Sequence, residues 1–425
     1  GLDSLLLVTH FFNGDMTAID LQTMSVISEA STGRGTNLSQ FVTLAPDGMK
    51  AYLPQTRSNS TNIALEFETT VFPEVNVIDL ETFGLLRRER ITIAGADQPV
   101  NMPLAAALAP DGGRIYIVNA GSDDLSVVDL ATSQGLAHLT VGANPRGIAI
   151  TPDGSRLFVN NVLDGTISVV NTSMLSVLHT VPITEVSLPS EILLGKKLFN
   201  SAASPVLSKD RWISCATCHF DGATDAQTWL GFPDGPRNTQ ALFGVGETLP
   251  IHWSGDLDEL EDVELTIRDI QFGKGLIPGE AHDSLGPPHS GRSANLDALA
   301  AYLASIEVPA SPHVGEPETI RSGESTFTEL GCQTCHAPPL YTDRQLHDVG
   351  TGDPALEKNS HGRGTRFDTP SLRAVWLTAP YLHDGSAPTL KDVLQAGSTH
   401  NVVDKIAAEE LSALIAYMRA LPLEE

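Results

Sequence analysis

Two short segments carry the residues of this chain that are best suited to redox chemistry. One is ISCATCHF, Ile213 to Phe220, and the other is GCQTCHA, Gly331 to Ala337. Each contains Cys-x-x-Cys followed directly by His, and the chain has four cysteines, all of them in these two segments. The pattern is typical of haem c attachment, in which two cysteines form thioethers and the histidine binds iron. We expect two covalent haem c groups, held by Cys215, Cys218 and His219 and by Cys332, Cys335 and His336.

Other uses of paired cysteines remain open at this point. Four thiolates from the two segments could bind zinc, or either pair could act as a redox dithiol. A zinc site of four thiolates would not require a histidine directly after the second cysteine of both segments. The repeated histidine therefore favours two haem groups.

Composition limits the class of protein. A chain of 425 residues exceeds one ordinary core and predicts two or three domains, and 41% hydrophobic residues is typical of globular proteins. No run of 18 apolar residues occurs, which predicts no transmembrane helix. A formal charge of -26 argues against nucleic acid as a partner and favours a basic redox protein, although acidity also confers solubility.

The chemistry also suggests a compartment. Haem c is attached on the outer side of the bacterial cytoplasmic membrane, so the two motifs predict a periplasmic or cell-surface protein. The sequence begins at Gly1 with no signal peptide pattern, and we expect a processed or truncated chain.

Repeats organise the first part of the chain. A Pro-Asp-Gly turn followed by an alternating strand occurs in the segments Thr43 to Leu53, Ala107 to Asn119 and Ala149 to Asn161. A second strand of the type VVDL follows each turn, and MTAIDL, Met16 to Leu21, belongs to the same series. Units of about 40 residues with several short strands indicate β-propeller blades.

These repeats resemble the YVTN family of surface-layer β-propellers. The resemblance covers residues 1–183 and implies three full blades and one partial blade, an incomplete propeller. An open propeller exposes sheet edges, so we expect further upstream blades that were cut away or are carried elsewhere. A long insertion at residues 57–73 is predicted to form a loop.

The pattern changes to a helical period after a short linker, residues 184–189. Amphipathic helices are expected before each attachment segment and at residues 298–306 and 408–421. The predicted fold is therefore multidomain, with all-β propeller blades followed by two mainly α-helical cytochrome c lobes, residues 190–307 and 316–425.

The second part resembles the bacterial di-haem cytochrome c peroxidase and MauG superfamily. The resemblance rests on LGKKLFN, ISCATCH, PRNT and HWSGD, and then on GCQTCH and FDTPSLRAVWLTAPYLHDG, over residues 188–421. It implies proximal iron ligands at His219 and His336, an aromatic link between the haems at Trp253, and a propionate anchor at Arg237. It also implies a calcium ion bound by Asn238, Thr378 and Pro380, whose hard oxygen atoms suit Ca2+.

The sequence departs from this family in three places. The slots for the distal Gln and Glu of true peroxidases hold Val263 and Gly273, so Glu264, or its neighbours Glu261 and Gln271, would have to replace them in acid-base work. The slot for the methionine ligand of the second haem holds Gly397, and the nearby His400 is the candidate sixth ligand. His252 is a candidate distal residue or sixth ligand of the first haem, with a surface position as the alternative.

The functional hypothesis is a di-haem c oxidoreductase. It would reduce H2O2, or oxidise a partner protein, at the first haem, with electrons relayed through the second haem. A small cytochrome or cupredoxin would donate electrons. Two alternatives remain open: a non-enzymatic electron carrier, and a propeller that docks a protein partner and presents it to the haems.

Overall fold

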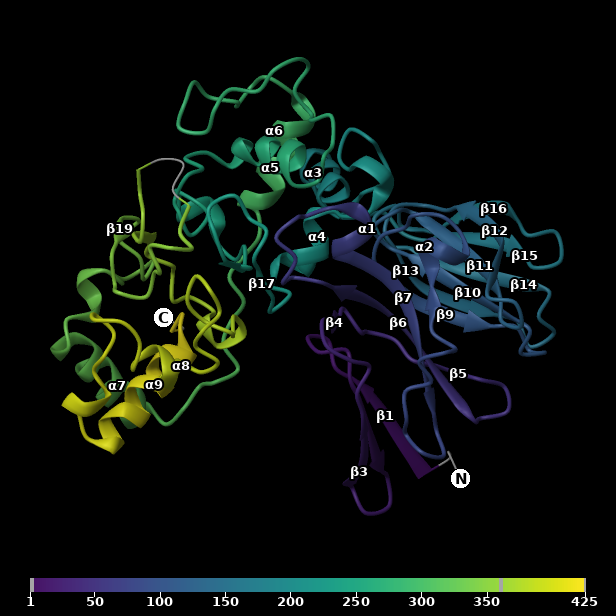
Figure 1. Ribbon diagram of the computed structural model, residues 1–425, viewed down its shortest axis with the longest axis horizontal. Helices are drawn as coiled ribbons and strands as arrows, with labels where there is room; N and C mark the ends of the chain where they lie inside the picture. Colours follow the sequence, from purple (N-terminus) through teal and green to yellow (C-terminus); the bar gives the residue numbers. More distant parts are fainter. Residues whose placement is uncertain (1–3, 359–361, 424–425) are drawn as a thin grey trace. The chain divides into compact units, whose positions relative to one another are not determined.

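The computed structural model describes residues 4–358 and 362–423. The chain divides into two compact units, each of which is described by itself (Figure 1). The first holds the described residues of Gly1–Asn59, Glu66–Thr217 and Ile267–Leu276, and the second those of Ser60–Leu65, Cys218–Thr266 and Ile277–Glu425. The first compact unit is built on sheets and the second is mainly helical and irregular, which is the order predicted from the sequence.

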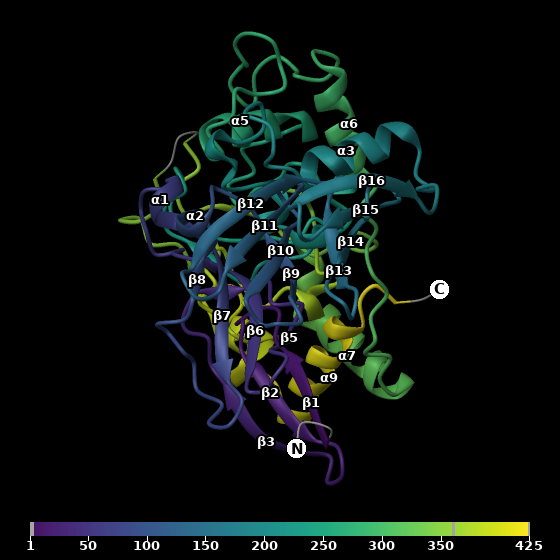
Figure 2. The ribbon, with the colours of Figure 1, turned by 90° about the vertical axis from the view of Figure 1, so that its right-hand side faces the viewer.

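Four antiparallel sheets follow one another along the first compact unit (Figures 1 and 2). The first sheet has three strands, the second five, and the third and fourth have four each. Their strands are, in order, β1 (Leu5–Thr9), β2 (Met16–Asp20) and β3 (Ser25–Ala30); β4 (Thr36–Asn37), β5 (Thr43–Leu44), β6 (Lys50–Ser58), β7 (Val71–Asp79) and β8 (Ile91–Thr92); β9 (Pro103–Leu108), β10 (Arg114–Asn119), β11 (Asp124–Asp129) and β12 (Gln134–Thr140); β13 (Pro145–Ile150), β14 (Arg156–Asn161), β15 (Thr166–Asn171) and β16 (Ser176–Pro182).

The repeated residues form the turns of these sheets. In the third sheet Asp111 accepts the backbone N–H of Gly113, and Gly112 has φ +71°, a conformation that favours glycine. The aspartate that ends β11, Asp129, accepts the backbone N–H and the hydroxyl of Thr132, which closes the next turn. These contacts explain why Pro-Asp-Gly and the Asp of VVDL recur at fixed places.

The sheets pack face to face through apolar side chains. Between the third and fourth sheets, Val118 and Val127 lie in one cluster with Leu157, Val159 and Val170. The insertion predicted at residues 57–73 is shorter than expected, because β6 and β7 continue as a paired ladder as far as Ser58 and Val71. Only residues 59–70 lie between these strands.

The helices α1 (Phe67–Thr70) and α2 (Ile93–Ala96) lie between strands, and the other helices lie in the part of the chain that carries the two attachment segments. The latter are α3 (Ser190–Asn200), α4 (Cys215–Cys218), α5 (Val263–Asp269), α6 (Ala294–Ala304), α7 (Pro317–Glu329), α8 (Leu390–Val393) and α9 (Ala408–Ala420). Two short two-stranded sheets, β17 (Thr228–Trp229) with β18 (Arg237–Asn238) and β19 (Leu346–His347) with β20 (Phe367–Asp368), lie in the irregular parts. Among the described residues, none of these helices has the length and apolar character needed to cross a membrane.

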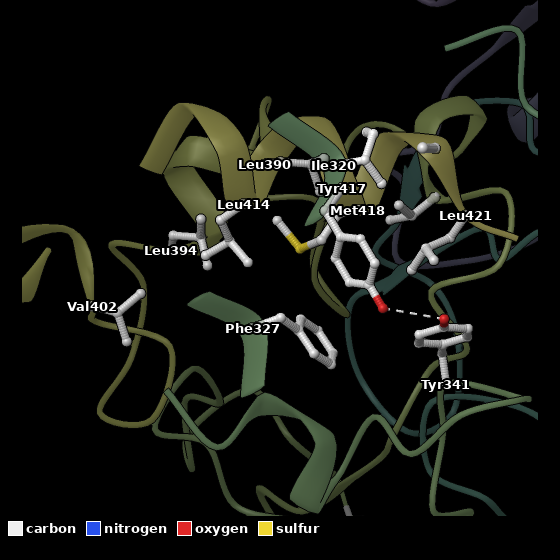
Figure 3. Close-up of a cluster of buried hydrophobic side chains, with 12 residues drawn as sticks. Ile320, Phe327, Tyr341, Leu390, Leu394, Val402, Leu414, Tyr417, Met418 and Leu421 are labelled. Carbon is white, nitrogen blue, oxygen red and sulfur yellow. Dashed lines mark hydrogen bonds between the residues drawn. The ribbon is translucent and has the colours of Figure 1, made fainter. Parts of the chain in front are cut away.

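The second compact unit has its own apolar core around α7 and α9 (Figure 3). Phe327 of α7 contacts the ring of Tyr417 of α9 at 5.4 Å between centroids, and Leu414 is fully buried beside them. A Cβ at Gly323 would overlap the Ala413 carbonyl, so the two helices approach as closely as glycine allows. Met418 belongs to this core.

Candidate haem-binding sites

The first attachment segment lies on α4 and the turn that follows it. Its histidine, His219, donates Nδ1–H to the backbone carbonyl of Gln240 at 2.9 Å. Burial lowers the pKa of His219 to about 4, so the imidazole is neutral at neutral pH. A neutral ring whose Nδ1 is used as a donor leaves Nε2 as the lone-pair nitrogen for a metal.

The second attachment segment repeats this arrangement on a different framework. His336 follows a single 3-10 turn, Cys332–Thr334, and donates Nδ1–H to the carbonyl of Tyr341 at 3.1 Å. Burial again lowers the pKa of the histidine to about 4. Both segments therefore fit haem c, with two cysteines for the thioethers and one oriented, neutral histidine for iron.

A second histidine faces His336. The rings of His336 and His400 have centroids 6.5 Å apart and planes inclined by 33°. Two metal–nitrogen bonds of about 2 Å each, together with the distance from each nitrogen to its ring centre, add up to roughly 6 Å. Burial lowers the pKa of His400, and its Nδ1 is buried without a hydrogen-bond partner. These features fit His400 as the sixth ligand of the second haem.

Two hydrogen bonds hold Trp253, one through its side chain and one through its backbone. Its indole Nε1–H donates to the carbonyl of Asn238 at 2.8 Å, and its own carbonyl accepts the N–H of Asp368 at 2.8 Å. The ring meets His383 edge to face at 6.5 Å, and His383 in turn stacks on Phe367 at 3.9 Å. Trp253 belongs to the same compact unit as both proximal histidines.

Arg237 lies in a buried polar network. Its guanidinium pairs with Glu357 at 2.8 Å and donates to the hydroxyl of Ser254 at 3.1 Å. Glu357 also contacts His383 at 3.1 Å, so Arg237 connects to the residues that support Trp253. The propionate role remains a prediction, since the arginine already has a carboxylate partner within the chain.

Two of the three predicted calcium ligands, Asn238 and Pro380, lie together, whereas the hydroxyl of Thr378 donates to the carbonyl of Val375. The side-chain amide of Asn238 lies 2.5 Å from the carbonyl of Pro380 and 3.3 Å from that of Leu382. The Oδ1 of Asn238 is buried with no hydrogen-bond partner. Because amide O and N are assigned from their contacts, a rotated Asn238 would place three oxygens around one point. An orphaned buried oxygen beside carbonyls fits a hard cation such as Ca2+.

The distal residues of true peroxidases have no counterparts at their slots. A Cβ at Gly273 would overlap the carbonyls of Val206 and Leu207, so this backbone accepts no side chain there. Val263, which opens α5, offers no acid or base. These two positions are therefore unsuited to general acid-base work.

The residues considered as replacements have other contacts. Glu264 is fully buried and its Oε1 accepts the N–H of Ile277 at 3.1 Å. Gln271 donates to the sulfur of Cys215 at 3.4 Å. His252 is 42% exposed at its side chain and its Nδ1 lies 3.1 Å from Asp256. Repulsion from a protonated His252 would be a minor cause of the lowered pKa of His219, after burial.

The slot for a methionine ligand at the second haem is also closed. Gly397 has φ +58°, a backbone conformation that side chains rarely adopt. A Cβ there would also overlap the carbonyl of Val349. The structure therefore explains why a ligand has to come from another position, and His400 is three residues further along.

Two buried carboxyl groups were not anticipated from the sequence. Burial and the charge of Asp343 raise the pKa of Asp368 to about 8, and burial raises that of Asp225 to about 7. Asp225 accepts the indole N–H of Trp229 at 3.1 Å. Asp368 lies within the FDTPSLR segment, and this motif could have drawn attention to its carboxyl group from the sequence.

Comparisons with known proteins support the resemblance predicted for residues 188–421. Residues 189–271 match a family model described as di-haem cytochrome c peroxidase, and residues 367–402 match one described as RoxA-like, cytochrome c-like. The chain is 28% identical to the methylamine utilization protein MauG of Methylorubrum extorquens, over 48% of this chain and 68% of that protein. This region is therefore similar to the di-haem cytochrome c peroxidase and MauG family.

Other similar proteins carry different functional names. The cytochrome c551 peroxidase of Pseudomonas aeruginosa is 27% identical over 54% of this chain and 77% of its own length. Hydrazine synthase subunit gamma of Kuenenia stuttgartiensis is 26% identical over 53% and 76%. A solved structure of hydrazine synthase from that organism gives a TM-score of 0.43 at 24% identity, covering 56% of this chain and 90% of the other, which is too low to carry an argument. A second such structure is matched over only 47% of its chain, with a TM-score of 0.34.

Proposed function

We propose that this chain is a di-haem c oxidoreductase in which the first haem site reacts with H2O2 or oxidises a partner protein. The second haem site would relay the electrons. Haem c, when bound, supplies the redox-active iron at each site. The chain itself supplies two oriented neutral histidines and an indole ring held between fixed backbone groups.

The observation that carries this proposal is the difference between the two histidines. His336 has the ring of His400 opposite it at 6.5 Å. The histidine considered for the same role at the first site, His252, has a side chain that is 42% exposed and an Nδ1 that lies 3.1 Å from Asp256. A site with two strong ligands suits electron storage, and a site with one ligand leaves room for a reactant. The first site would therefore bind the reactant.

Spectroscopy of the holoprotein tests this division. We expect one low-spin ferric haem, contributed by the second site, and one high-spin ferric haem, contributed by the first. Stopped-flow mixing of the half-reduced protein with H2O2 should then give oxidation well above the rate of free haem. Two low-spin haems, together with a rate no higher than that of free haem, would contradict the proposal.

Trp253 is proposed as the link between the two sites. Trp253→Phe keeps an aromatic ring but loses the N–H that bonds the Asn238 carbonyl. We expect electron transfer between the haems to slow by about tenfold or more, with both haem spectra retained. Trp376→Phe is the matched control, since that ring lies beside His313 rather than His383.

A second candidate function is a non-enzymatic electron carrier, with the sheets of the first compact unit as a docking module. It is favoured by the closed slot at Gly273 and the apolar side chain at Val263, which provide no acid or base. The same stopped-flow measurement separates the two, because a carrier exchanges electrons with a reduced cytochrome or cupredoxin but does not consume H2O2.

Three further proposals concern the compartment, the electron donor and the arrangement of the sheets. We place the protein in the periplasm, with a small basic redox protein as donor, in keeping with the charge of -26. The four sheets are proposed as blades of an incomplete YVTN-type propeller. Salt-dependent electron transfer from a basic cytochrome tests the donor proposal, and a rate indifferent to ionic strength would contradict it.

A structural calcium ion is proposed at Asn238, Thr378 and Pro380. Chelation with EGTA should change the haem spectra and lower the melting temperature, and Ca2+ should reverse both changes. Asn238→Ala should abolish the response to Ca2+ because it removes the orphaned Oδ1. An elemental analysis of the purified protein without calcium, and no response to EGTA, would contradict the site.

A further inference from the structure

A buried asparagine of the sheet region contacts the first attachment segment. Asn101 stands just before β9 and is 1% exposed. Its Nδ2 donates to the carbonyl of Trp212 and to the hydroxyl of Thr217, both at 3.0 Å. Its Oδ1 accepts the hydroxyl of Ser214 at 3.0 Å. All four residues belong to the first compact unit.

These contacts surround the haem attachment motif. Thr217 is the residue between Ala216 and Cys218 in C-A-T-C-H, and its hydroxyl also accepts the N–H of Ser214 at 3.0 Å. Trp212, Ser214 and Thr217 are all buried, so none of their polar groups can replace Asn101 with water. One side chain therefore satisfies polar groups on both sides of Cys215. We call this arrangement the Asn101 clamp.

The third sheet holds the asparagine in place. The N–H of Asn101 donates to the hydroxyl of Ser122 at 3.1 Å, and its carbonyl accepts the N–H of Gly121 at 3.0 Å. A Cβ on Gly121 would overlap Asn101 Oδ1. The position of the clamp thus depends on the absence of a side chain at Gly121.

The repeat pattern alone does not explain the clamp. Asn37 in the second sheet stands nine residues before its Pro-Asp-Gly proline, as Asn101 does in the third. Each is followed by a buried residue with positive φ, Leu38 at 55° and Met102 at 54°. Asn37 is equally buried, but neither its Nδ2 nor its Oδ1 has a hydrogen-bond partner. The contacts of Asn101 therefore come from the attachment segment and not from the repeat.

We propose that Asn101 is a positioning residue for the first haem. It holds residues 212–217 in the conformation that presents Cys215 to the porphyrin and starts the turn to His219. The sheet region would then be a structural part of the first haem site rather than a separate module. The proposal rests on the proposed function only in that this motif carries haem c.

The second attachment segment provides an internal reference in the same molecule. Thr334 occupies the position in C-Q-T-C-H that Thr217 has in the first motif, but it is exposed. A change that acts through the clamp should alter the first haem and leave the second one unchanged. A change that merely destabilises the protein would alter both.

The main test compares threonine variants of the full-length holoprotein. Thr217→Val keeps the shape but removes the hydroxyl, and we expect a shifted spectrum and midpoint potential for the first haem only. Hydrogen exchange of residues 212–217 should become at least tenfold faster. Thr217→Ser should restore the original values, and Thr334→Val should leave both haems unchanged. An unaltered first haem in Thr217→Val would overturn the proposal.

Variants on the sheet side complete the test. Asn101→Ala and Gly121→Ala should shift the first haem in the same direction as Thr217→Val, because each removes or displaces the amide. Asn37→Ala and Gly95→Ala are the matched controls, since Gly95 has open space at its Cβ position. A clamp variant that changes the melting temperature but neither haem signal would show a purely structural role and overturn the proposal. Absence of any first haem in the unaltered protein would instead contradict the proposed function.

Discussion

The two haem attachment segments have nearly the same sequence but different surroundings. The first, residues 213–220, is largely buried and is fixed by hydrogen bonds from Asn101. The second, residues 331–337, is half-buried or exposed throughout and follows α7, whose apolar face packs on α9. Opposite its histidine lies the ring of His400. The attachment motif therefore fixes the cofactor, whereas the elements around it decide what each site can do.

This difference also separates two ways of stabilising a site. A polar clamp loses several buried hydrogen bonds together when one side chain is removed. An apolar core loses burial and packing in proportion to the atoms removed. Each of the following changes acts mainly on one of the two segments.

The largest effect is expected in the core that supports the second segment. Leu414→Ala removes a fully buried side chain of α9 and should lower the free energy of unfolding by about 2–5 kcal/mol. Thermal or denaturant unfolding of the holoprotein measures this. Ser412→Ala, at an exposed position of the same helix, is the control and should cost less than about 1 kcal/mol.

Removal of His400 should make the two haem sites alike in iron coordination. His400→Ala should convert the second haem from low-spin to high-spin and raise its midpoint potential by on the order of 0.1 V, because an imidazole ligand stabilises ferric iron. EPR and a redox titration check both effects. His313→Ala is the control, and an unchanged low-spin signal in His400→Ala would refute the ligand assignment.

An ionic network next to the first segment predicts a pH dependence. Burial by itself would lower the pKa of His138, but the carboxylates of Asp124, 3.2 Å from its Nε2, and of Asp97, hydrogen-bonded to its Nδ1, raise it to about 9. A histidine with a raised pKa stabilises the fold fully below its unfolded pKa of about 6.5 and loses this contribution as the pH rises through 9. Asp124 also lies 3.8 Å from Arg211, just before the segment.

The expected loss between pH 6.5 and 9 is roughly 2–3 kcal/mol, given 1.36 kcal/mol for each pKa unit. Unfolding measured at several pH values should show this slope in the unaltered protein. His138→Gln should flatten it, whereas His179→Gln, at an exposed position of β16, should not. A slope that survives in His138→Gln would assign the pH dependence to other groups.

The smallest effect is expected at Glu264. Its carboxylate is buried and accepts the N–H of Ile277, so Glu264→Gln should change the rate of H2O2 consumption by less than about threefold. Stopped-flow kinetics check this, with His252→Gln as the comparison at the first site. A loss of 100-fold or more in Glu264→Gln would establish it as the missing acid-base group.

Residue type and spacing were enough to predict the parts with strong local signals. The two attachment motifs, the Pro-Asp-Gly turns and the helices at α7 and α9 follow from short patterns, because each depends on neighbours in the sequence. The amphipathic helix expected at residues 408–421 is confirmed as α9, with Met418 on its buried face. The resemblance of the second part to its family is supported by the comparisons.

Contacts between distant segments could not be predicted in the same way. Asn101 and Thr217 are far apart in sequence, and nothing in the blade repeat distinguishes Asn101 from Asn37. The shorter insertion at residues 59–70 arose because β6 and β7 extend their pairing beyond the repeat length. The predicted calcium site, the propionate role of Arg237 and the domain boundaries stay predictions.

Gly273 and Gly397 limit the single substitutions that could give this chain the side chains of true peroxidases. Both stand where those enzymes carry functional side chains, and both are enclosed by backbone carbonyls that do not yield as side chains do. A side chain introduced at either position would clash with these backbone carbonyls before it could serve as a ligand or an acid. An engineer, or natural selection, would first have to rebuild the loops at Val206 and Val349. A single substitution at Gly273 or Gly397 is therefore not enough to supply the residue that the resemblance to true peroxidases implies there.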